Sequence, residues 1–518
     1  HHVRGAGEGG LGAGLVAQLP VGDQVARRGL GVHLNGALSH DLAQVRDGRQ
    51  LLVFHHHGGG GVGGRANTYQ VIITKPEEGQ TANKNNLSLA ATIGGNGGTG
   101  SHGGLVTVDN SGAIETSGDT AHGIYAQSVG GGGGDGGNGT VGLGGILNLK
   151  GADSIVTSKY GSLKTYKNIQ VAVGGSAGST GDGGVVEVDN SNHVTTHGAN
   201  SIAILAQSVG GGGGIGGTGV SGATGLLGLG GEGGSAGNGG TVTVKQTGDA
   251  LVETFGVASH GVFAQSVGGG GGMAGSVNRV MTSSMKEGPV TVPAMNVGAG
   301  LAMGRSGGNG GSGAKVEVDF DGMIVTHGDS AAAIMAQSVG GGGGVLGDLG
   351  NVTDVLSYQL GSAGDAGNAG VVTVDLTGTV KTAGNSATGI FAQSAAGTAG
   401  NTHTGEAGNV NVTVNGSVLT AQILDAEDDG TLEDPKRGLG AVGILAQSVA
   451  VDNAKNGDIA VTINGADTVV AGGRSLVEDD KHTSLGVGVW ITDGDANTLT
   501  NYGLITTFDG VDDGYAIF

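Results

Sequence analysis

The sequence predicts an all-β protein, and specifically a right-handed parallel β-helix (β-solenoid) with glycine-rich inserts between its rungs. One peptide, Ala-Gln-Ser-Val or a near copy, occurs six times, and four copies run directly into five glycines. The 119 glycines among 518 residues follow no Gly-X-Y period, and 37% hydrophobic against 13% charged residues is unlike a disordered chain. Internal repeats therefore remain as the explanation. The copies begin at Ala126, Ala206, Ala264, Ala336, Ala392 and Ala446.

Each copy ends a fixed unit of three short alternating runs. In the first complete unit these are residues 106–108, 113–116 and 123–126, separated by Gly, Asn and Asp. Period-two alternation between such turn residues is typical of strand, turn, strand, turn, strand. Stacking one such circuit on the next buries a continuous interior and pairs successive rungs about 4.8 Å apart. The same frame recurs from Val186, Val242, Val316 and Val372.

The third strand carries apolar residues on both faces. Its first position is Ile or Val, and its second is Tyr, Leu, Phe or Met. Since successive residues face opposite sides, we expect one face to line the interior and the glycine-rich inserts to cover the other. The glutamine of the repeat should form an amide ladder along the axis. This ladder comprises Gln127, Gln207, Gln265, Gln337, Gln393 and Gln447.

Composition divides the chain into three regions. Residues 1–66 hold six of the ten Arg and seven of the fifteen His but no trace of the repeat, and we interpret them as an Arg/His-rich leader that is not necessarily native. Residues 67–450 are the glycine-rich solenoid, and residues 451–518 are looser rungs of the same frame. The chain begins with His1 and ends inside a strand pattern, so we expect it to be part of a longer protein.

Charge and cysteine content exclude several classes of function. A net charge of −21 offers no source for the phosphate neutralisation that nucleic-acid binding requires. With no Cys there is no disulfide scaffold, thiolate zinc site, iron–sulfur cluster or cysteine nucleophile. The long uncharged stretch 210–231 is mostly glycine and too poor in large apolar residues for a membrane helix.

Motifs for catalysis match only through the abundance of glycine. Ser176, Ser235 and Ser306 each lie in a Gly-x-Ser-x-Gly sequence, but none lies between a strand and a helix, where a nucleophile elbow must lie. The chain has no Gly-Lys-Ser/Thr phosphate loop and no His-Glu-x-x-His. We therefore predict no enzyme, no catalytic residue and no cofactor-binding residue.

Metal-ligand patterns are equally weak. The tract 55–57 is three histidines, but a leader or tag-like sequence explains it better than a metal site. Asp425, Glu427 and Asp429 match the first ligand positions of a calcium-binding loop. Lys436, however, occupies the last position, where such a loop needs a bidentate Glu. We predict no metal site. Four further histidines near the second turn are interpreted as exposed turn residues: His122, His197, His260 and His327.

The repeat resembles the passenger region of bacterial autotransporters, the type V secretion proteins of Gram-negative outer membranes. The most specific element is Gly-Ile-Tyr-Ala-Gln-Ser-Val-Gly-Gly at residues 123–131, and the resemblance covers roughly residues 88–518. It implies a β-helical passenger that reaches the outside of the cell, with a signal peptide before it and an outer-membrane barrel after it. The absence of Cys agrees with passage through a narrow pore.

Passengers of this family include adhesins, aggregation factors, proteases and esterases. Without a catalytic domain or motif here, the resemblance implies a surface-exposed adhesive or structural rod that contacts host or neighbouring-cell ligands, or other copies of itself. One alternative is the stalk of an enzyme whose catalytic domain lies outside this sequence. Another is a glycine-rich matrix- or ice-binding solenoid, which would need a flat array of outward residues. A threonine at one position of five units aligns, but the unequal spacings of the repeats should break any flat face.

Overall fold

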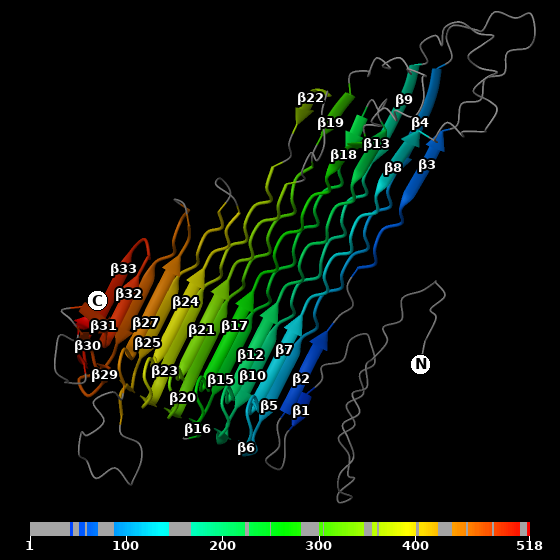
Figure 1. The fold of residues 1–518 in the computed structure, drawn as a ribbon. Helices are drawn as coiled ribbons and strands as arrows, with labels where there is room; N and C mark the ends of the chain where they lie inside the picture. The colour runs from blue at the N-terminus through cyan, green and yellow to red at the C-terminus, as the bar shows by residue number, and fades with distance from the viewer. Residues whose placement is uncertain are drawn as a thin grey trace, which may run out of the picture.

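The computed structural model confirms an all-β parallel solenoid (Figure 1). Its first complete rung consists of β5 (Val106–Asn110), β6 (Ile114–Thr116) and β7 (Ile124–Val129). Each strand pairs in parallel with the equivalent strand of the next rung. The structure describes residues 42–44, 51–56, 60–70, 87–143, 167–222, 227–248, 250–280, 300–303, 305–346, 355–359, 362–399, 404–422, 438–451, 454–478, 481–507 and 515–518.

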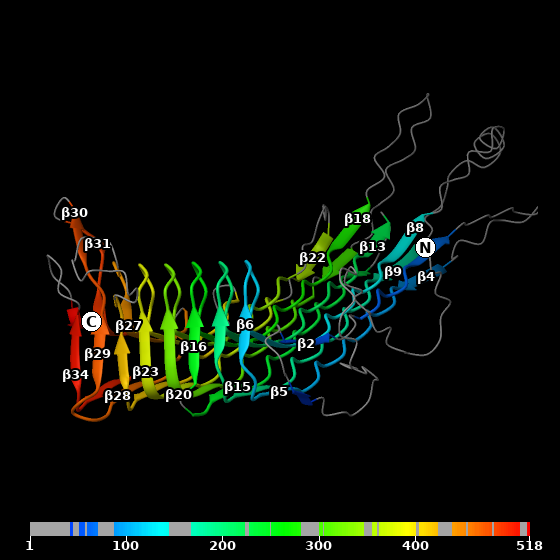
Figure 2. The same ribbon diagram turned by 90° about the horizontal axis from the view of Figure 1, so that it is seen from below.

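Three columns of strands form the coil, and Figure 2 shows its rungs side by side. The first column continues through β10 (Val186–Asn190), β15 (Val242–Gln246), β20 (Val316–Thr326), β23 (Val372–Thr382), β25 (Val410–Val414), β28 (Ile459–Ile463) and β33 (Asn497–Asn501). The second contains β11 (Val194–Thr196), β16 (Leu251–Thr254), the ends of β20 and β23, β26 (Ser417–Leu419), β29 (Val469–Gly472) and β34 (Leu504–Thr507). The third contains β12 (Ile204–Val209), β17 (Val262–Val267), β21 (Ile334–Val339), β24 (Ile390–Ala395), β27 (Val442–Val449), β32 (Val487–Thr492) and β35 (Tyr515–Ile517).

The interior of the coil is mainly apolar. Each third strand turns its first, third and fifth residues inward, so Ile334 and Ala336 are fully buried while Met335 and Gln337 are partly exposed. The first and second strands contribute valines and isoleucines to the same continuous cluster. The inward assignment of the third strand is therefore confirmed. Burial of the apolar interior drives the coil to form, at about 25 cal/mol for each Å² removed from water.

The glycine-rich segments leave one corner of the coil and form two layers of their own. The outgoing layer follows each third strand (residues 130–138, 210–218, 268–276, 340–346 and 396–399), and residues 60–64 belong to it. The returning layer precedes each first strand (residues 94–104, 174–184, 231–240, 306–314, 362–370 and 404–408). The two layers pack on each other beside the coil rather than over the third strand. The expectation that the inserts cover the outer face of that strand is therefore wrong.

Hydrogen bonds in both layers repeat every three residues. In the outgoing layer Gly130 N donates to Val209 O in the next rung, and Gly131 N donates across the layers to Ser101 O. Three residues on, Gly133 N donates to Gly212 O and Gly134 N donates to Gly98 O. The third residue of each triplet faces outward. A three-residue period is typical of an extended polyproline II-like chain, which makes no hydrogen bonds within itself. Its backbone N–H and C=O groups are therefore free to pair with neighbouring segments.

The close approach of the two layers requires glycine. A Cβ added to Gly268 would lie 1.9 Å from Gly311 O of the returning layer, and one added to Gly269 would lie 2.1 Å from Gly211 O of the preceding rung. Real Cβ atoms do not come that close to backbone, so a side chain at these inward positions would force the layers or the rungs apart. The pentaglycine of the repeat is thus a packing requirement of the double layer.

Two small parallel sheets close the far end of the glycine layers. One contains β3 (Ala66–Gln70), β8 (Gly139–Leu143), β13 (Gly219–Gly222) and β18 (Val277–Val280). The other contains β4 (Leu87–Ile93), β9 (Lys167–Val173), β14 (Leu227–Leu229), β19 (Gly300–Met303) and β22 (Val355–Gln359). The differences in repeat spacing arise largely in the stretches of sequence that connect the strands of one sheet to those of the other, such as residues 144–166 and 281–299, which lie outside the described residues. The layers therefore stay in register, and the expectation that unequal spacings break every flat face is wrong.

The pairing extends beyond the repeats at both ends. β1 (Leu42–Gln44) pairs with β5, and β2 (Leu51–His56) pairs with β7, so paired strands begin before residue 66, where the composition changes. Beyond residue 450 the coil continues through β28 and β32, as the looser frame predicts, and an antiparallel hairpin of β30 (Leu476–Glu478) and β31 (Lys481–Ser484) projects from it. Within the described ranges, no helix could cross a membrane.

Candidate interaction surfaces

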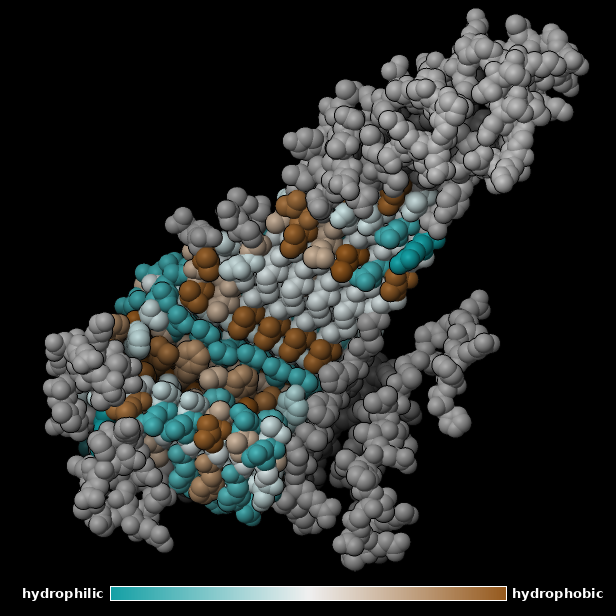
Figure 3. All heavy atoms as spheres, in the orientation of Figure 1, coloured by the Kyte–Doolittle hydropathy of each residue, from teal (hydrophilic) through white to brown (hydrophobic). Residues whose placement is uncertain are grey.

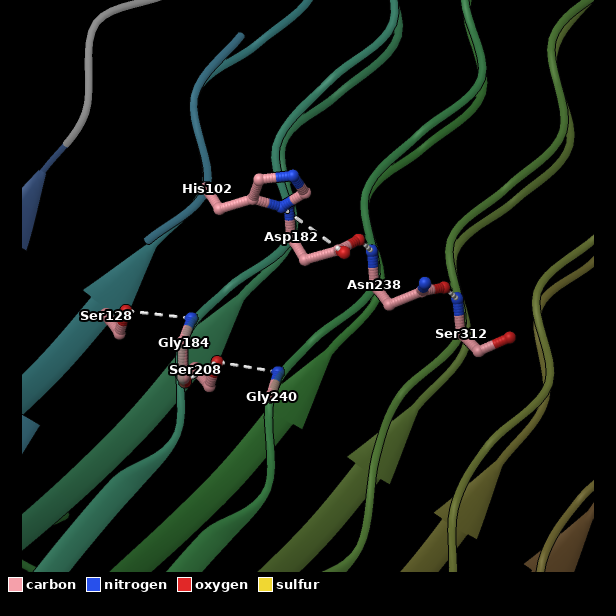
Figure 4. A network of polar contacts seen from close by, with 8 residues as sticks. All are labelled: His102, Ser128, Asp182, Gly184, Ser208, Asn238, Gly240 and Ser312. Carbon is pink, nitrogen blue, oxygen red and sulfur yellow. Dashed lines mark hydrogen bonds and ion pairs between the residues drawn. The ribbon is translucent and has the colours of Figure 1, made fainter. Parts of the chain in front are cut away.

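The serine of the repeat joins the coil to the glycine layers. The Ser208 hydroxyl is fully buried, donates to Gly184 O (2.7 Å) and accepts from Gly240 N (2.7 Å). Ser128 makes the same pair of bonds, to Gly104 O (2.8 Å) and from Gly184 N (2.9 Å), and Figure 4 shows two of these contacts. Each serine thus holds the end of a third strand to the returning segments of its own and the next rung. Sequence reasoning missed this role, although the invariance of the serine among the six copies was a signal for it.

The glutamines of the repeat form the predicted ladder. Gln127 Nε2 donates to Gln207 Oε1 at 2.6 Å, and each glutamine in turn donates to the next. The last, Gln447, donates to the Asp493 carboxylate at 2.8 Å. These side chains lie on the outer face of the third strand, half-buried, and the Nε2 of each of the six donates one hydrogen bond along the axis. These hydrogen bonds between successive rungs support a structural role for the glutamines.

The returning glycine layer has a polar outer face. His102, Asp182, Asn238, Ser312 and Asn368 occupy one outward column, and each side chain accepts the backbone N–H of the residue above it (Figure 4). For example, Asp182 Oδ1 accepts from Asn238 N at 2.7 Å. Outward side chains here replace the hydrogen bonds that a third layer would supply. Charged residues also occupy the outer faces of the first and second strands: Asp109, Glu187, Asp189, Lys245, Asp319, Glu115 and Glu253.

The outgoing layer and the third strands together form a surface of a different kind, which we call the neutral face. Its strand part presents Tyr, Leu, Phe and Met, then the glutamine ladder, then a valine column that includes Val209, Val267 and Val339. Next comes a column of glycines, and then an exposed column in which Ile215, Met273 and Val345 follow one another. In the orientation of Figure 3 these columns appear as parallel brown, teal and white rows. Among the described residues of the neutral face, three side chains are charged: Asp135 lies in the exposed column between Val62 and Ile215, Arg65 lies in the next outward column, and Asp493 ends the glutamine ladder.

The four histidines near the second turn fall into two columns rather than one. His122 and His260 are partly buried, and their Nδ1 atoms accept the backbone N–H groups of Ile202 and Ala332, each at 3.0 Å. Burial lowers the pKa of both imidazoles, which agrees with a neutral ring that accepts a hydrogen bond. The expectation that these two residues lie on an exposed edge is therefore wrong.

The other two histidines sandwich an aromatic ring. His197 and His327 stack on either face of Phe255, with ring centroids 4.8 and 4.3 Å apart. His197 Nε2 lies 3.1 Å from Glu115 Oε1, and His327 Nε2 lies 3.0 Å from Glu253 Oε1. This column is held by stacking and by pairing with carboxylates. No cluster of three potential metal ligands occurs among the described residues.

The aligned threonines point into the coil. Thr196, Thr254, Thr326 and Thr382 are fully buried, and Thr196 Oγ1 donates to Ser201 O at 2.5 Å, five residues on. The other threonines make the same bond, which fixes the turn into the third strand. They therefore cannot form an outward binding array, and these threonines cannot supply an ice- or matrix-binding face.

The remaining sequence motifs gather into no reactive site. Ser176, Ser235 and Ser306 lie on the outward positions of the returning glycine layer, and the described residues contain no helix and so no strand-to-helix turn. The acidic segment 425–430 with Lys436 lies outside the described residues, as does His57, and only the backbone of His55 and His56 is described, in β2. Comparison with protein-family models, with curated proteins and with solved structures gives no match.

Proposed function

We propose that this chain is the β-helical passenger of an autotransporter, displayed on the outer surface of a Gram-negative cell as an elongated adhesive rod. The observation that carries the proposal is the stack of near-identical rungs, which presents the same outward residues again and again along one axis. A rigid array of this kind suits multivalent contact, because weak bonds at many rungs add up when their geometry permits simultaneous engagement. The ligands would be groups on host or neighbouring-cell surfaces, or other copies of the chain, and no enzymatic step is proposed.

Surface display and adhesion can be tested together. The full-length gene is expressed in a Gram-negative host, and intact cells are labelled with an antibody against residues 88–518. We expect labelling that external protease removes, together with increased attachment of the cells to one another or to a surface. Labelling that requires cell lysis would contradict the proposal, as would display without any gain in attachment.

A further inference from the structure

The glycine column of the neutral face lies where the fold does not itself need glycine. A Cβ added to Gly270 would meet nothing within 4 Å, one added to Gly212 would meet only Gly270 O at 3.8 Å, and the tightest contact in the column is that of Gly342 with Thr398 O at 3.1 Å. Thr398 occupies the same column in a later rung, since Gly343 N donates to its carbonyl. A side chain is thus compatible with this position. The inward glycines beside it, by contrast, allow none.

Neighbouring outward columns carry side chains. Three residues before Gly270 stands Val267, and three residues after it stands Met273, which is 47% exposed. At about 3.1 Å per residue the two flanking columns lie roughly 9 Å to either side of the glycine column. The surface is therefore a shallow groove floored by Gly212, Gly270 and Gly342 between two apolar ridges. Figure 3 shows the glycine layer as a white band with a brown row on one side and mixed brown and teal spheres on the other.

The groove belongs to a surface that avoids charge. The chain carries −21 overall, and its other outer faces hold most of the described Asp and Glu residues. In the ridge beyond the groove, Val62, Ile215, Met273 and Val345 are 74%, 44%, 47% and 58% exposed. Asp135 interrupts this ridge between Val62 and Ile215, so its continuous apolar part runs from Ile215 to Val345. Contiguous apolar rows on an acidic protein mark a surface that another molecule covers.

We propose that the molecule which covers the neutral face is a second copy of this chain, packed face to face about a twofold axis. A two-fold interface requires a surface that complements itself. Here the exposed ridge that contains Met273 can enter the groove of the partner while the partner's ridge enters this one. Both copies have the same rung spacing of about 4.8 Å, so a ridge meets its groove at every rung.

The area of the neutral face and its low charge both favour a second copy of the chain as the molecule that covers it. Four to six rungs, each about 45 Å across this face, give roughly 1,000 Å² per copy, against about 800 Å² per partner in a typical stable interface. Two copies that met through their acidic faces would repel each other, whereas the rungs of the neutral face that contain Ile215, Met273 and Val345 carry no charged side chain among their described residues on this face. Groove amides such as Gly270 N have no acceptor among the described residues, and oxygen atoms of the second copy or bridging water can accept from them.

A second copy of the chain would be one of the ligands of the proposed adhesive rod. The dimer itself does not depend on the proposed function, but a role for the dimer in contact between cells rests on it. Purified protein tests it without any cell. Sedimentation equilibrium of the full chain should show a monomer–dimer equilibrium. The Met273→Glu variant, which places a charge in the ridge, should weaken the dimer at least about tenfold, which is ~1.4 kcal/mol. The Gly270→Leu variant, which fills the groove, should weaken it although the face becomes more apolar.

Val371→Glu is the matched control, because Val371 is a 37% exposed valine at the coil end of the polar, returning layer. It should leave the dimer unchanged, and circular dichroism should show the same fold in all variants. A wild-type chain that stays monomeric overturns the pairing, and so does equal weakening by Met273→Glu and Val371→Glu. Stronger association of Gly270→Leu also overturns it. The two proposals fail separately. A monomer in solution would contradict the dimer but not surface adhesion, and a chain that is never displayed would contradict surface adhesion but not the dimer.

Discussion

The coil and the glycine double layer share the same rungs but are held together in different ways. In the coil, side chains such as Ile334 fill the space between three strand columns and are completely buried. Between the glycine layers there is almost no side chain, and hydrogen bonds from residues such as Gly131 and Gly134 join backbone to backbone. The coil is therefore stabilised mainly by the hydrophobic effect. The double layer depends on hydrogen-bond geometry, against the large entropy that glycine loses on ordering.

The largest expected effect is in the interior of the coil. Ile334→Asp places an unpaired carboxylate where no water reaches, so we expect a loss of more than about 4 kcal/mol in unfolding free energy. Gln337→Ala, on the outer face of the same strand, breaks two bonds of the amide ladder and should cost only about 1 kcal/mol. Chemical denaturation measures both. Equal losses of unfolding free energy in the two variants would contradict the assignment of Ile334 to the interior. Because each rung contacts only its neighbours, the unfolding caused by Ile334→Asp should stay partly local.

The second effect distinguishes two adjacent glycines of the outgoing layer. Gly269→Ala would bring a methyl group within 2.1 Å of Gly211 O and should cost roughly 2–4 kcal/mol by separating the rungs. Gly270→Ala meets nothing and should be neutral or stabilising by up to about 1 kcal/mol, because the unfolded chain loses freedom. Thermal unfolding of the pair is the measurement. A similar destabilisation by both substitutions would mean that the layers are not packed as described.

The third effect lies at the junction of the two regions. Ser208→Ala removes a hydroxyl that serves both Gly184 O and Gly240 N, so we expect a loss of about 1–3 kcal/mol. The loss should appear first as faster hydrogen exchange at the start of β15, where Gly240 leads into the strand. Ser235→Ala, on an outward position of the returning layer, is the control and should change stability by less than about 0.5 kcal/mol.

The smallest effect is a dependence on pH in the coil. Burial holds the pKa of His260 below its ordinary value of 6.5, so the unfolded chain binds a proton more readily than the folded one. The stability that the neutral ring contributes is complete above pH 6.5 and is lost as the pH falls below it. His260→Asn keeps an acceptor for Ala332 N and should flatten this dependence in melting curves recorded between about pH 7.5 and pH 5. An unchanged slope would contradict the role given to this histidine.

The sequence predicted the coil better than the glycine layers, for a physical reason. Period-two alternation around Ile334 reports directly which side of a strand is buried, and the glutamine ladder follows from the register. A run of glycine has no side-chain pattern, so neither its three-residue period nor its inward positions can be read from Gly269 or Gly270. The outward residues did carry that period: Asn96, Thr99 and His102 stand three apart, as do Ser176, Ser179 and Asp182.

The extra rung before residue 66 was missed because its third strand, Leu51–His56, departs from the repeat. The glycines that follow it preserve the frame, since Gly60 N donates to Gly132 O and Gly63 N donates to Asp135 O. Val62 consequently stands in the column of Ile215 and Met273. The spacing of Gly60, Gly61, Gly63 and Gly64 around one apolar residue was the available signal.

Residue-resolved amide hydrogen exchange on dilute protein tests the ordered glycine double layer most directly. Along residues 268–272 the amides of Gly268, Gly269, Gly271 and Gly272 donate hydrogen bonds, whereas Gly270 N has no acceptor among the described residues. We expect strong protection at the four donors and rapid exchange at Gly270, so that two protected amides alternate with one unprotected amide. Rapid exchange at all five glycines would show that these segments are not packed as a double layer and would contradict the account.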